Sequence, residues 1–259
     1  MDLGLSGKRA LVLSSSRGLG LASAKALAAE GAEVFMTARS GDKLDAAVAE
    51  IVAAGGRAHA FAANLTKDAD RIFAEAERTM GGVDILIANT GGPPARMAAE
   101  VPDEDWMPQF EAMVLPVFRL ARLCLPGMRA RGFGRIVTIA SSGVIQPIPN
   151  LAMSNALRAS ILGYSKTLAA EVAKDGITVN LVLPGRIRTD RTAELDAANA
   201  KRLGKSAEEI EAAAVSAIPA GRYGKVEEFG DVVAFLASER ASYITGSKIA
   251  VDGGAVRSV

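Results

Sequence analysis

The stretch ALVLSSSRGLGLASAKALA, residues 10–28, joins an apolar run to a helical pattern through a turn rich in glycine and serine. A glycine-bearing turn between a first strand and a first helix leaves backbone N–H groups free at the positive helix end, which suits a pyrophosphate. Gly18 and Gly20 allow a close approach of backbone to phosphate and of helix to strand. Three hydroxyls precede them, on Ser14, Ser15 and Ser16. Glycine and serine are also ordinary turn residues, so the position after the first strand is what favours a dinucleotide-binding loop.

Further apolar runs alternate with Ala-rich helical patterns, of which 21–31 and 42–56 end at glycines. The candidate strands are residues 10–15, 33–38, 57–63, 84–89, 134–141, 177–183 and 247–252. Strand–helix alternation with apolar strands predicts a parallel sheet covered by helices on both faces. Because no linker or composition shift interrupts the sequence, we expect a single doubly wound α/β domain (Rossmann fold) of seven strands over residues 1–259.

The alternation is interrupted once, at about 186–220, by two polar helical patterns. We call this segment the helical insertion. The second pattern opens with the capping-box spacing Ser206 to Glu209. Insertions after the carboxyl end of a strand in such sheets often form substrate lids. A surface excursion without a role is the alternative.

The bulk properties exclude several classes of protein. Thirty basic and 29 acidic residues give a net charge of +1, so no charge bias indicates nucleic acid or acidic membranes. The single cysteine, Cys124, excludes an intrachain disulfide and a cysteine-based zinc cluster, and we expect no metal site. The sequence shows neither a signal peptide nor an apolar run of about 18 residues, so we expect a soluble, cytoplasmic protein.

The end of the second strand, MTARSGDK (36–43), bears on the choice of dinucleotide. A fold of this kind that prefers NAD usually carries an acidic residue here for the ribose 2′-OH, whereas arginine suits a 2′-phosphate. Thr37 and Ala38 are not acidic, Arg39 follows them, and Arg17 lies in the neighbouring loop. These residues favour NADP over NAD, with two solvated arginines as the alternative.

Motifs along nearly the whole chain resemble the short-chain dehydrogenase/reductase family, and within it the 3-oxoacyl-acyl-carrier-protein reductases. SSSRGLG (14–20) stands where that family has T-G-x-x-x-G-x-G, although the first T-G pair is replaced by Leu13-Ser14. The other matching segments are ILIANTGG (85–92), GRIVTIASS (134–142), GITVNLVLPGRIRTD (176–190), IPAGRYGKVEEF (218–229) and YITGSKIAVDGG (243–254). The resemblance implies hydride transfer between NADP(H) and a carbonyl or alcohol, such as a 3-oxoacyl thioester or a small ketone.

The catalytic positions implied by the resemblance are mostly altered. The family uses a serine, a tyrosine that transfers the proton, a lysine four residues later, and an asparagine that orders a water relay. Ser141 fills the serine position, but Ser154 stands in place of the tyrosine and Arg158 in place of the lysine. Met113 stands in place of the asparagine. The chain is therefore similar to the family but belongs to a divergent subgroup that lacks Tyr-x-x-x-Lys.

The replacements change the proton chemistry. An aliphatic hydroxyl such as that of Ser154 is far less acidic than a phenol, and a guanidinium stays protonated and cannot relay a proton. We expect Ser141 to polarise the substrate oxygen, Arg158 to position the ribose, and a water near Ser154 or Ser142 to supply the proton. Other donors are poorer or undecided. Tyr164 lies about 15 Å along the helix from Ser154, Tyr223 could approach the site, His59 is more readily a structural residue of the third strand, and Asn155 points off the Ser154–Arg158 face.

The resemblance also implies a set of cofactor contacts and an assembly. The cofactor-binding residues would be Ser14, Ser16, Arg17, Gly18, Leu19, Gly20, Arg39, Asn64, Leu65, Asn89, Gly91, Arg158, Pro184, Gly185, Ile187 and Thr189. Arg186, Arg188 and Arg191 with Asp190 form a charged cluster that attracts an anionic substrate or is merely solvated. A homotetramer would use helices at about 103–129 and 151–174. A catalytically silent NADP-binding oligomer, acting as a sensor or partner protein, remains the alternative to an enzyme.

Overall fold

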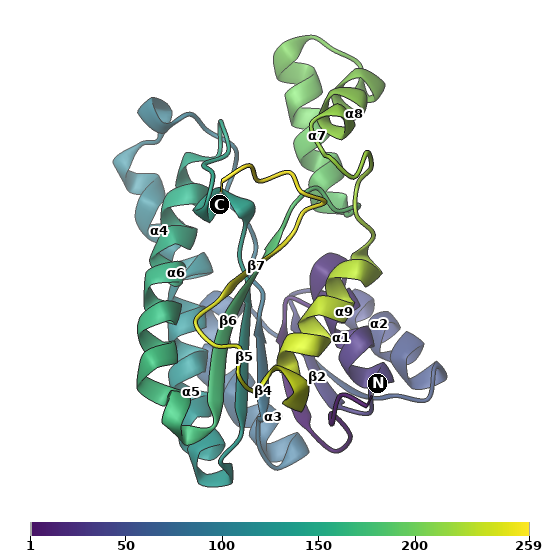
Figure 1. Ribbon diagram of the computed structural model, residues 1–259, viewed down its shortest axis with the longest axis vertical. Helices are drawn as coiled ribbons and strands as arrows, with labels where there is room; N and C mark the ends of the chain where they lie inside the picture. Colours follow the sequence, from purple (N-terminus) through teal and green to yellow (C-terminus); the bar gives the residue numbers. More distant parts are fainter. Residues whose placement is uncertain (1, 259) are drawn as a thin grey trace.

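Seven parallel strands form one sheet in the order β3-β2-β1-β4-β5-β6-β7 (Figure 1). This computed structural model describes residues 2–258. The strands are β1 Arg9–Leu13, β2 Glu33–Ala38, β3 Arg57–Ala62, β4 Ile85–Ala88, β5 Gly134–Ile139, β6 Ile177–Pro184 and β7 Lys248–Val251. Each strand end lies within two residues of the boundary predicted from the apolar runs, and the predicted doubly wound α/β class is confirmed.

Helices cover both faces of the sheet, and each layer buries its own apolar core. On one face lie α1 Gly18–Ala29, α2 Gly41–Ala53 and α9 Val226–Ala237. On the other face lie α3 Leu65–Met80, α4 Asp103–Met113, α5 Leu115–Arg131 and α6 Ala152–Val172 (Figure 1). The residues of β4 and β5 are all buried, as continuous apolar strands between two helical layers should be.

The segment 103–129, predicted as one helix, is two helices that meet at Val114. Val114 has φ −106° and ψ −55° and lies between the last residue of α4 and the first of α5. Pro116 occupies the first turn of α5, where a missing N–H does no harm. Within a continuous helix the same proline would remove an i→i−4 hydrogen bond and clash with the preceding turn.

The helical insertion contributes α7 Asp190–Leu203 and α8 Ala207–Ser216 between β6 and α9. Figure 1 shows this pair standing beyond the end of the sheet, apart from both helical layers. The predicted capping box is present, since Ser206 Oγ accepts the N–H of Glu209 at 3.2 Å and the Glu209 carboxylate accepts the N–H of Ser206 at 2.8 Å. No helix among residues 2–258 has both the length and the apolar character of a membrane span.

The strand order reverses between β1 and β4, because the chain runs outward from β1 to β3 and then returns to β4 beside β1. In open α/β sheets, ligands bind in the crevice outside the carboxyl ends of the strands at such a reversal. We call the space beyond the carboxyl ends of β1 and β4 the switch-point crevice. The turn after β1, the loop after β4 and the end of β5 therefore decide what the protein binds.

Candidate functional site

The turn from β1 into α1 brings backbone against the start of the helix. A Cβ added to Gly20 would lie 2.5 Å from the Ser14 carbonyl oxygen and 2.8 Å from Asn89 Nδ2, so only glycine fits there. Asn89 Nδ2 donates to the same Ser14 oxygen at 3.1 Å and ties the loop after β4 to this turn. The first turn of α1 carries no acidic side chain. Its N–H groups and positive helix end therefore fit the pyrophosphate of a dinucleotide.

The three serines of the turn differ in what they can offer a phosphate. Ser15 is fully buried, donates from Oγ to the Val12 oxygen at 2.9 Å and accepts the Thr37 N–H at 3.2 Å. The prediction that its hydroxyl adds to a phosphate site is therefore wrong, because the hydroxyl joins β1 to β2. Ser14 has φ +48°, in the left-handed region that favours glycine, at the position where the related motif has glycine. Ser16 is half-buried at the crevice side of the same turn.

The two arginines proposed to select NADP are in different states. Arg39 is exposed directly after β2. Arg17 forms an ion pair with Asp190 at 2.7 Å, which joins the turn after β1 to the first residue of α7. Nearby, Asn64 caps α3 by accepting the Thr66 N–H at 3.0 Å, and Leu65 is the first residue of that helix. Both arginines are exposed, but Arg17 is engaged by Asp190, so Arg39 is the one of the two that is available at the expected 2′-phosphate position.

Arg158 is buried beneath the crevice, with 8% of its surface exposed. Its guanidinium donates from Nη1 to the Ile139 carbonyl at 3.0 Å and from Nη2 to the Gly91 carbonyl at 3.1 Å. It therefore joins the end of β5 to the loop after β4. Burial, with a smaller contribution from the positive charge of Arg191, lowers the pKa of Arg158 to about 10, so the side chain remains charged at neutral pH.

Ser141 follows the end of β5 and caps the short 3-10 turn Ser142–Val144. Its Oγ accepts the Gly143 N–H at 3.1 Å, which occupies a lone pair and leaves the hydroxyl proton able to donate. Asn155 fixes this turn against α6, since it donates to the Ile148 carbonyl at 2.9 Å and accepts the Ile148 N–H at 3.3 Å. A Cβ on Gly143 would lie 2.4 Å from Asn155 Oδ1 and 3.3 Å from Ser141 Oγ.

Ser154 lies one turn before Arg158 on α6 and is 8% exposed. Two other residues considered in the sequence analysis, Met113 and His59, have structural roles. Met113 is buried in the apolar core at the end of α4. His59 Nε2 lies 2.7 Å from Glu33 Oε1 across the β2–β3 pair, consistent with the expected structural role.

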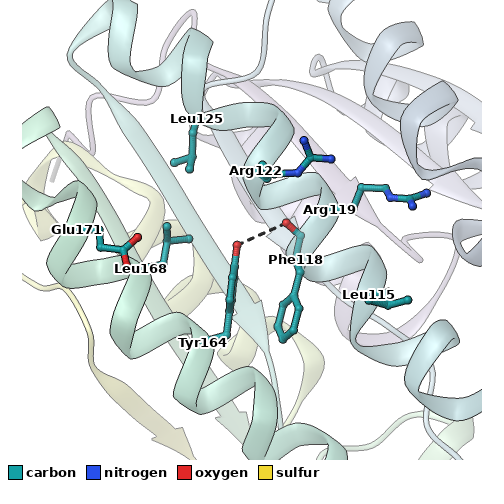
Figure 2. A pocket seen from close by; sticks show the side chains of 8 residues that line it. All are labelled: Leu115, Phe118, Arg119, Arg122, Leu125, Tyr164, Leu168 and Glu171. Carbon is teal, nitrogen blue, oxygen red and sulfur yellow. Dashed lines mark hydrogen bonds between the residues drawn. The ribbon is translucent and has the colours of Figure 1, made fainter. Parts of the chain in front are cut away.

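Neither candidate tyrosine replaces the missing proton donor. Tyr223 is buried and donates to Asp196 Oδ2 at 2.8 Å inside the helical insertion, and burial together with that carboxylate raises the pKa of its phenol. Tyr164 stacks on Phe118 with ring centroids 4.0 Å apart and donates to the Phe118 carbonyl at 3.4 Å. Figure 2 shows both rings in a pocket of about 420 Å³ between α5 and α6, on the outer side of that helical layer.

The first turn of α7 reaches both sides of the switch-point crevice. Arg17 pairs with Asp190 on one side, and the position of a Gly18 Cβ lies 3.6 Å from the Thr189 side chain. On the other side, Arg191 Nη2 donates to the Pro93 carbonyl at 2.8 Å. Thr189 caps the helix by accepting the Thr192 N–H at 3.2 Å. The helical insertion is therefore attached across the crevice at its base.

The chain before α7 is held to β7 and to the segment that precedes α9. Gly185 N–H donates to the Val251 carbonyl at 2.9 Å, and a Cβ on Gly185 would lie 2.6 Å from the Asp252 Cα. Pro184 ends β6, and the buried Ile187 bridges to Gly224. These contacts place the expected P-G turn at the carboxyl end of β6.

The charged cluster of the helical insertion is largely neutralised within that insertion. Arg186 pairs with Asp196, and Arg188 pairs with Glu211 at 2.6 Å. Both guanidinium groups also lie over the Tyr223 ring, at 5.8 Å and 5.3 Å from its centroid. Of the arginines expected to attract an anionic substrate, Arg191 has the weakest ion pair, because its guanidinium lies 3.5 Å from the Glu194 carboxylate.

Sequence reasoning did not anticipate the residues that position the site. Asn155 was weighed only as a poorer proton donor, yet its side chain fixes the loop after Ser141. Asn89 was expected to contact cofactor, and its amide also holds the Ser14 carbonyl. Their partners lie seven and 75 residues away in the chain, so no local spacing signals either contact.

Comparison with known proteins agrees with this geometry over almost the whole chain. Residues 13–256 match the protein family described as "Enoyl-(Acyl carrier protein) reductase". The 3-oxoacyl-[acyl-carrier-protein] reductase FabG of Escherichia coli (strain K12) is 38% identical over 252 residues, which are 96% of this chain and 97% of that protein. The FabG of Aquifex aeolicus (strain VF5) is 36% identical over 98% of this chain and 99% of its own.

A solved structure gives the same result for the fold. The L-sorbose reductase from Gluconobacter frateurii, complexed with NADPH and L-sorbose, superimposes with a TM-score of 0.94 at 36% identity and covers 100% of both chains. The family match spans residues 13–256 and the superposition covers both chains in full, so the likeness is not confined to the dinucleotide loop. Sequence and structure together assign this chain to the short-chain dehydrogenase/reductase family.

Proposed function

We propose that the protein is an NADP(H)-dependent oxidoreductase that interconverts a carbonyl and an alcohol without a tyrosine as proton donor. The observation that carries the proposal is the hydrogen bonding of the Ser141 hydroxyl. Its oxygen accepts the Gly143 N–H, and its proton remains able to donate at the end of β5, beside the switch-point crevice. A hydroxyl so placed can hydrogen-bond a substrate oxygen on which negative charge develops.

The residues around the crevice fit NADP(H). The close approach at Gly20 and the unoccupied positive end of α1 suit the pyrophosphate, and the exposed Arg39 suits the 2′-phosphate. Relatives of similar fold have been solved with NADPH, among them the sorbose reductase and the actinorhodin polyketide ketoreductase, the latter 32% identical with a TM-score of 0.92 over 97% of this chain and 98% of its own. When bound, NADPH supplies the hydride that reduces a carbonyl carbon, and the carbonyl oxygen then requires a proton.

Residues of this chain stabilise the charge on the substrate oxygen and hold the water that protonates it. Ser141 donates a hydrogen bond to the substrate oxygen, and the fixed charge of Arg158 stabilises negative charge that develops nearby. A water beside Ser154 delivers the proton, because the side chains of Tyr164, Tyr223 and His59 are engaged by other groups of the protein. The absence of a positioned acid typically costs about 10²–10⁴-fold in rate, while the proximity of bound reactants is retained.

One observation favours a second candidate, an NADP-binding protein without turnover. Both terminal nitrogens of Arg158 already donate to backbone carbonyls, of Ile139 and Gly91. A side chain used in this way is less free to hold a ribose than the lysine it replaces in the family pattern. The observation weakens one proposed contact and leaves the roles of Gly20, Arg39 and Ser141 unchanged.

Turnover measured by NADPH oxidation with a panel of ketones, short oxo acids and oxoacyl thioesters separates the two candidates. We expect slow turnover by the unaltered protein and at least about a tenfold loss in Ser141→Ala. Ser160→Ala is the matched control, because it also removes one hydroxyl, which donates to the Leu157 carbonyl on the exposed side of α6. No turnover by the unaltered protein, with turnover created by Ser154→Tyr combined with Arg158→Lys, would instead support the silent NADP-binding protein.

We also propose that the protein assembles as a homotetramer through α5 and α6. The pocket between these helices carries the exposed Leu115 at its edge, 41% accessible, beside the stacked Phe118 and Tyr164 (Figure 2). Light scattering should therefore show a mass above one chain that falls in Leu115→Arg. Leu203→Arg is the control, because Leu203 is similarly exposed, at 49%, but ends α7 in the helical insertion. A monomeric unaltered protein would exclude the assembly.

A further inference from the structure

Arg158 is a buried cation without a carboxylate partner among residues 2–258. Its two short contacts go to the carbonyl oxygens of Ile139 and Gly91, which are dipoles and not charges. With 8% of its surface exposed, it is far from fully hydrated. A buried charge left uncompensated is strongly unfavourable, so such a group in a crevice is a candidate partner for an anion that arrives from outside. Three of the five guanidinium N–H groups remain for such a ligand.

A second guanidinium approaches the same loop from the opposite side. Arg191, on the first turn of α7, donates to the Pro93 carbonyl, while Arg158 donates to the Gly91 carbonyl two residues earlier. A Cβ on the intervening Gly92 would lie 3.4 Å from Arg191 Nη2. The charge of Arg191 acts on Arg158 strongly enough to contribute to the lowering of its pKa. We call Arg158 and Arg191 the arginine pair.

Arg191 has one carboxylate partner, Glu194, at 3.5 Å, whereas the neighbouring cations are held by carboxylates at closer range. Arg186 and Arg188 are paired with Asp196 and Glu211, and Arg17 is paired with Asp190. The arginine pair therefore concentrates positive charge at the loop after β4, on the side of the crevice toward β5. The pyrophosphate of a dinucleotide belongs at the other side, at the start of α1. Two separate anionic groups can thus be held at once.

We propose that the arginine pair binds the carboxylate of the substrate, so that the protein acts on short oxo acids and not on neutral ketones. This inference rests on the proposed function, and it deepens it by naming the substrate class. Arginine is suited to this task because its planar fork matches carboxylate geometry.

The position of Ser141 sets the length of the oxo acid. Ile139, whose carbonyl holds Arg158, lies two residues before Ser141, or about 7 Å along an extended chain. A carboxylate at Arg158 and a carbonyl oxygen at Ser141 are then separated by only a few bonds. Arg191 closes over the carboxylate from the base of the helical insertion, which gives that insertion a contact with the substrate itself.

Calorimetric titration tests the proposal with pairs of probes that differ in charge and in one methyl group. Pyruvate, acetoacetate and levulinate are each compared with their methyl esters, with and without saturating NADP+. We expect at least one acid to bind about tenfold or more tightly than its ester. In Arg191→Gln that ratio should fall at least about threefold. Arg188→Gln, which removes a paired arginine of the same insertion, should leave the ratio unchanged.

The outcomes separate this inference from the proposed function. If none of the three acids binds more tightly than its ester, or if Arg191→Gln and Arg188→Gln give the same ratio as the unaltered protein, the arginine pair is not a carboxylate site. If NADP+ displaces the acid, the pair holds the cofactor, and the substrate assignment is wrong. If the acid binds by the expected criteria but no turnover occurs, the site stands and the oxidoreductase proposal falls.

Discussion

Replacing Gly20 by alanine tests the close packing on which the dinucleotide loop depends. The added methyl group would lie 2.5 Å from the Ser14 carbonyl oxygen, 2.8 Å from Asn89 Nδ2 and 3.0 Å from the Ser15 Cα. Two of these atoms belong to the backbone, so the turn must move and the Asn89–Ser14 hydrogen bond must weaken. Overpacking costs about 1–3 kcal/mol and the hydrogen bond about 0.5–1.5 kcal/mol, whereas alanine in a helix gains about 0.5–1 kcal/mol. The net loss is about 0.5–4 kcal/mol.

Urea unfolding and NADPH titration of the same variant measure the two consequences. Stability should fall by the amount given above, and NADPH affinity should fall with it because the N–H groups of the turn are displaced. Gly163→Ala is the matched control. It lies inside α6 with no atom within 4 Å of the added Cβ, so it should gain up to about 1 kcal/mol. If Gly20→Ala is as stable as Gly163→Ala and binds NADPH normally, the reasoning about the turn is wrong.

Three further changes, the first with a matched control at Asn150, probe other parts of the structure. Ser14→Gly removes a left-handed serine, φ +48°, and should stabilise the protein by about 0.5–1 kcal/mol in urea. Asn150→Gly should change little, because asparagine tolerates its φ of +63°. Arg39→Ala should weaken NADPH binding about 10–100-fold in calorimetry and leave NADH unchanged; equal losses would refute the 2′-phosphate role. Burial opposes ionisation of Asp84, but hydrogen bonds from Arg9 outweigh it and hold the pKa of Asp84 below its usual range. Its stabilisation is therefore present above about pH 4 and lost as pH falls through the lower folded value, and Asp84→Asn should flatten that acid limb in pH-dependent melting.

The fold followed from sequence because apolar runs such as β1, β2 and β4 alternate with helices, several of which end at a glycine. Both signals are local, so the bounds of β2 and the start of β6 matched without any knowledge of tertiary contacts. The break at Val114 was not anticipated. Pro116 signals a helix start as readily as a kink, and the sequence alone does not separate one bent helix from two.

The site was predictable only in part, for a physical reason. The resemblance to the family places Ser141, Ser154 and Arg158 at the catalytic positions, because the chain keeps the family spacing from the serine strand to the following helix. The side-chain partners depend on segments that meet only after folding. Ser15 shows the limit, since its hydroxyl faces Thr37 across the β1–β2 pair and not the crevice. Tyr223 is a second example, because its phenol donates to Asp196 on α7, a contact that forms only after folding.

The hydrogen bonds of Arg158 give a reason why the family's tyrosine and lysine are both replaced on α6, by Ser154 and Arg158. A lysine ammonium is a compact charge on a flexible stem, whereas a guanidinium is a wide fork with donors on both arms. The two arms of Arg158 span the carbonyls of Ile139 and Gly91, and thereby fix β5 and the loop after β4 to each other. A tyrosine restored at position 154 alone would face a cation held by the backbone and unable to relay a proton. We therefore expect family-type proton transfer to require Arg158→Lys together with Ser154→Tyr, whereas in the proposal made above Arg158 holds an anion.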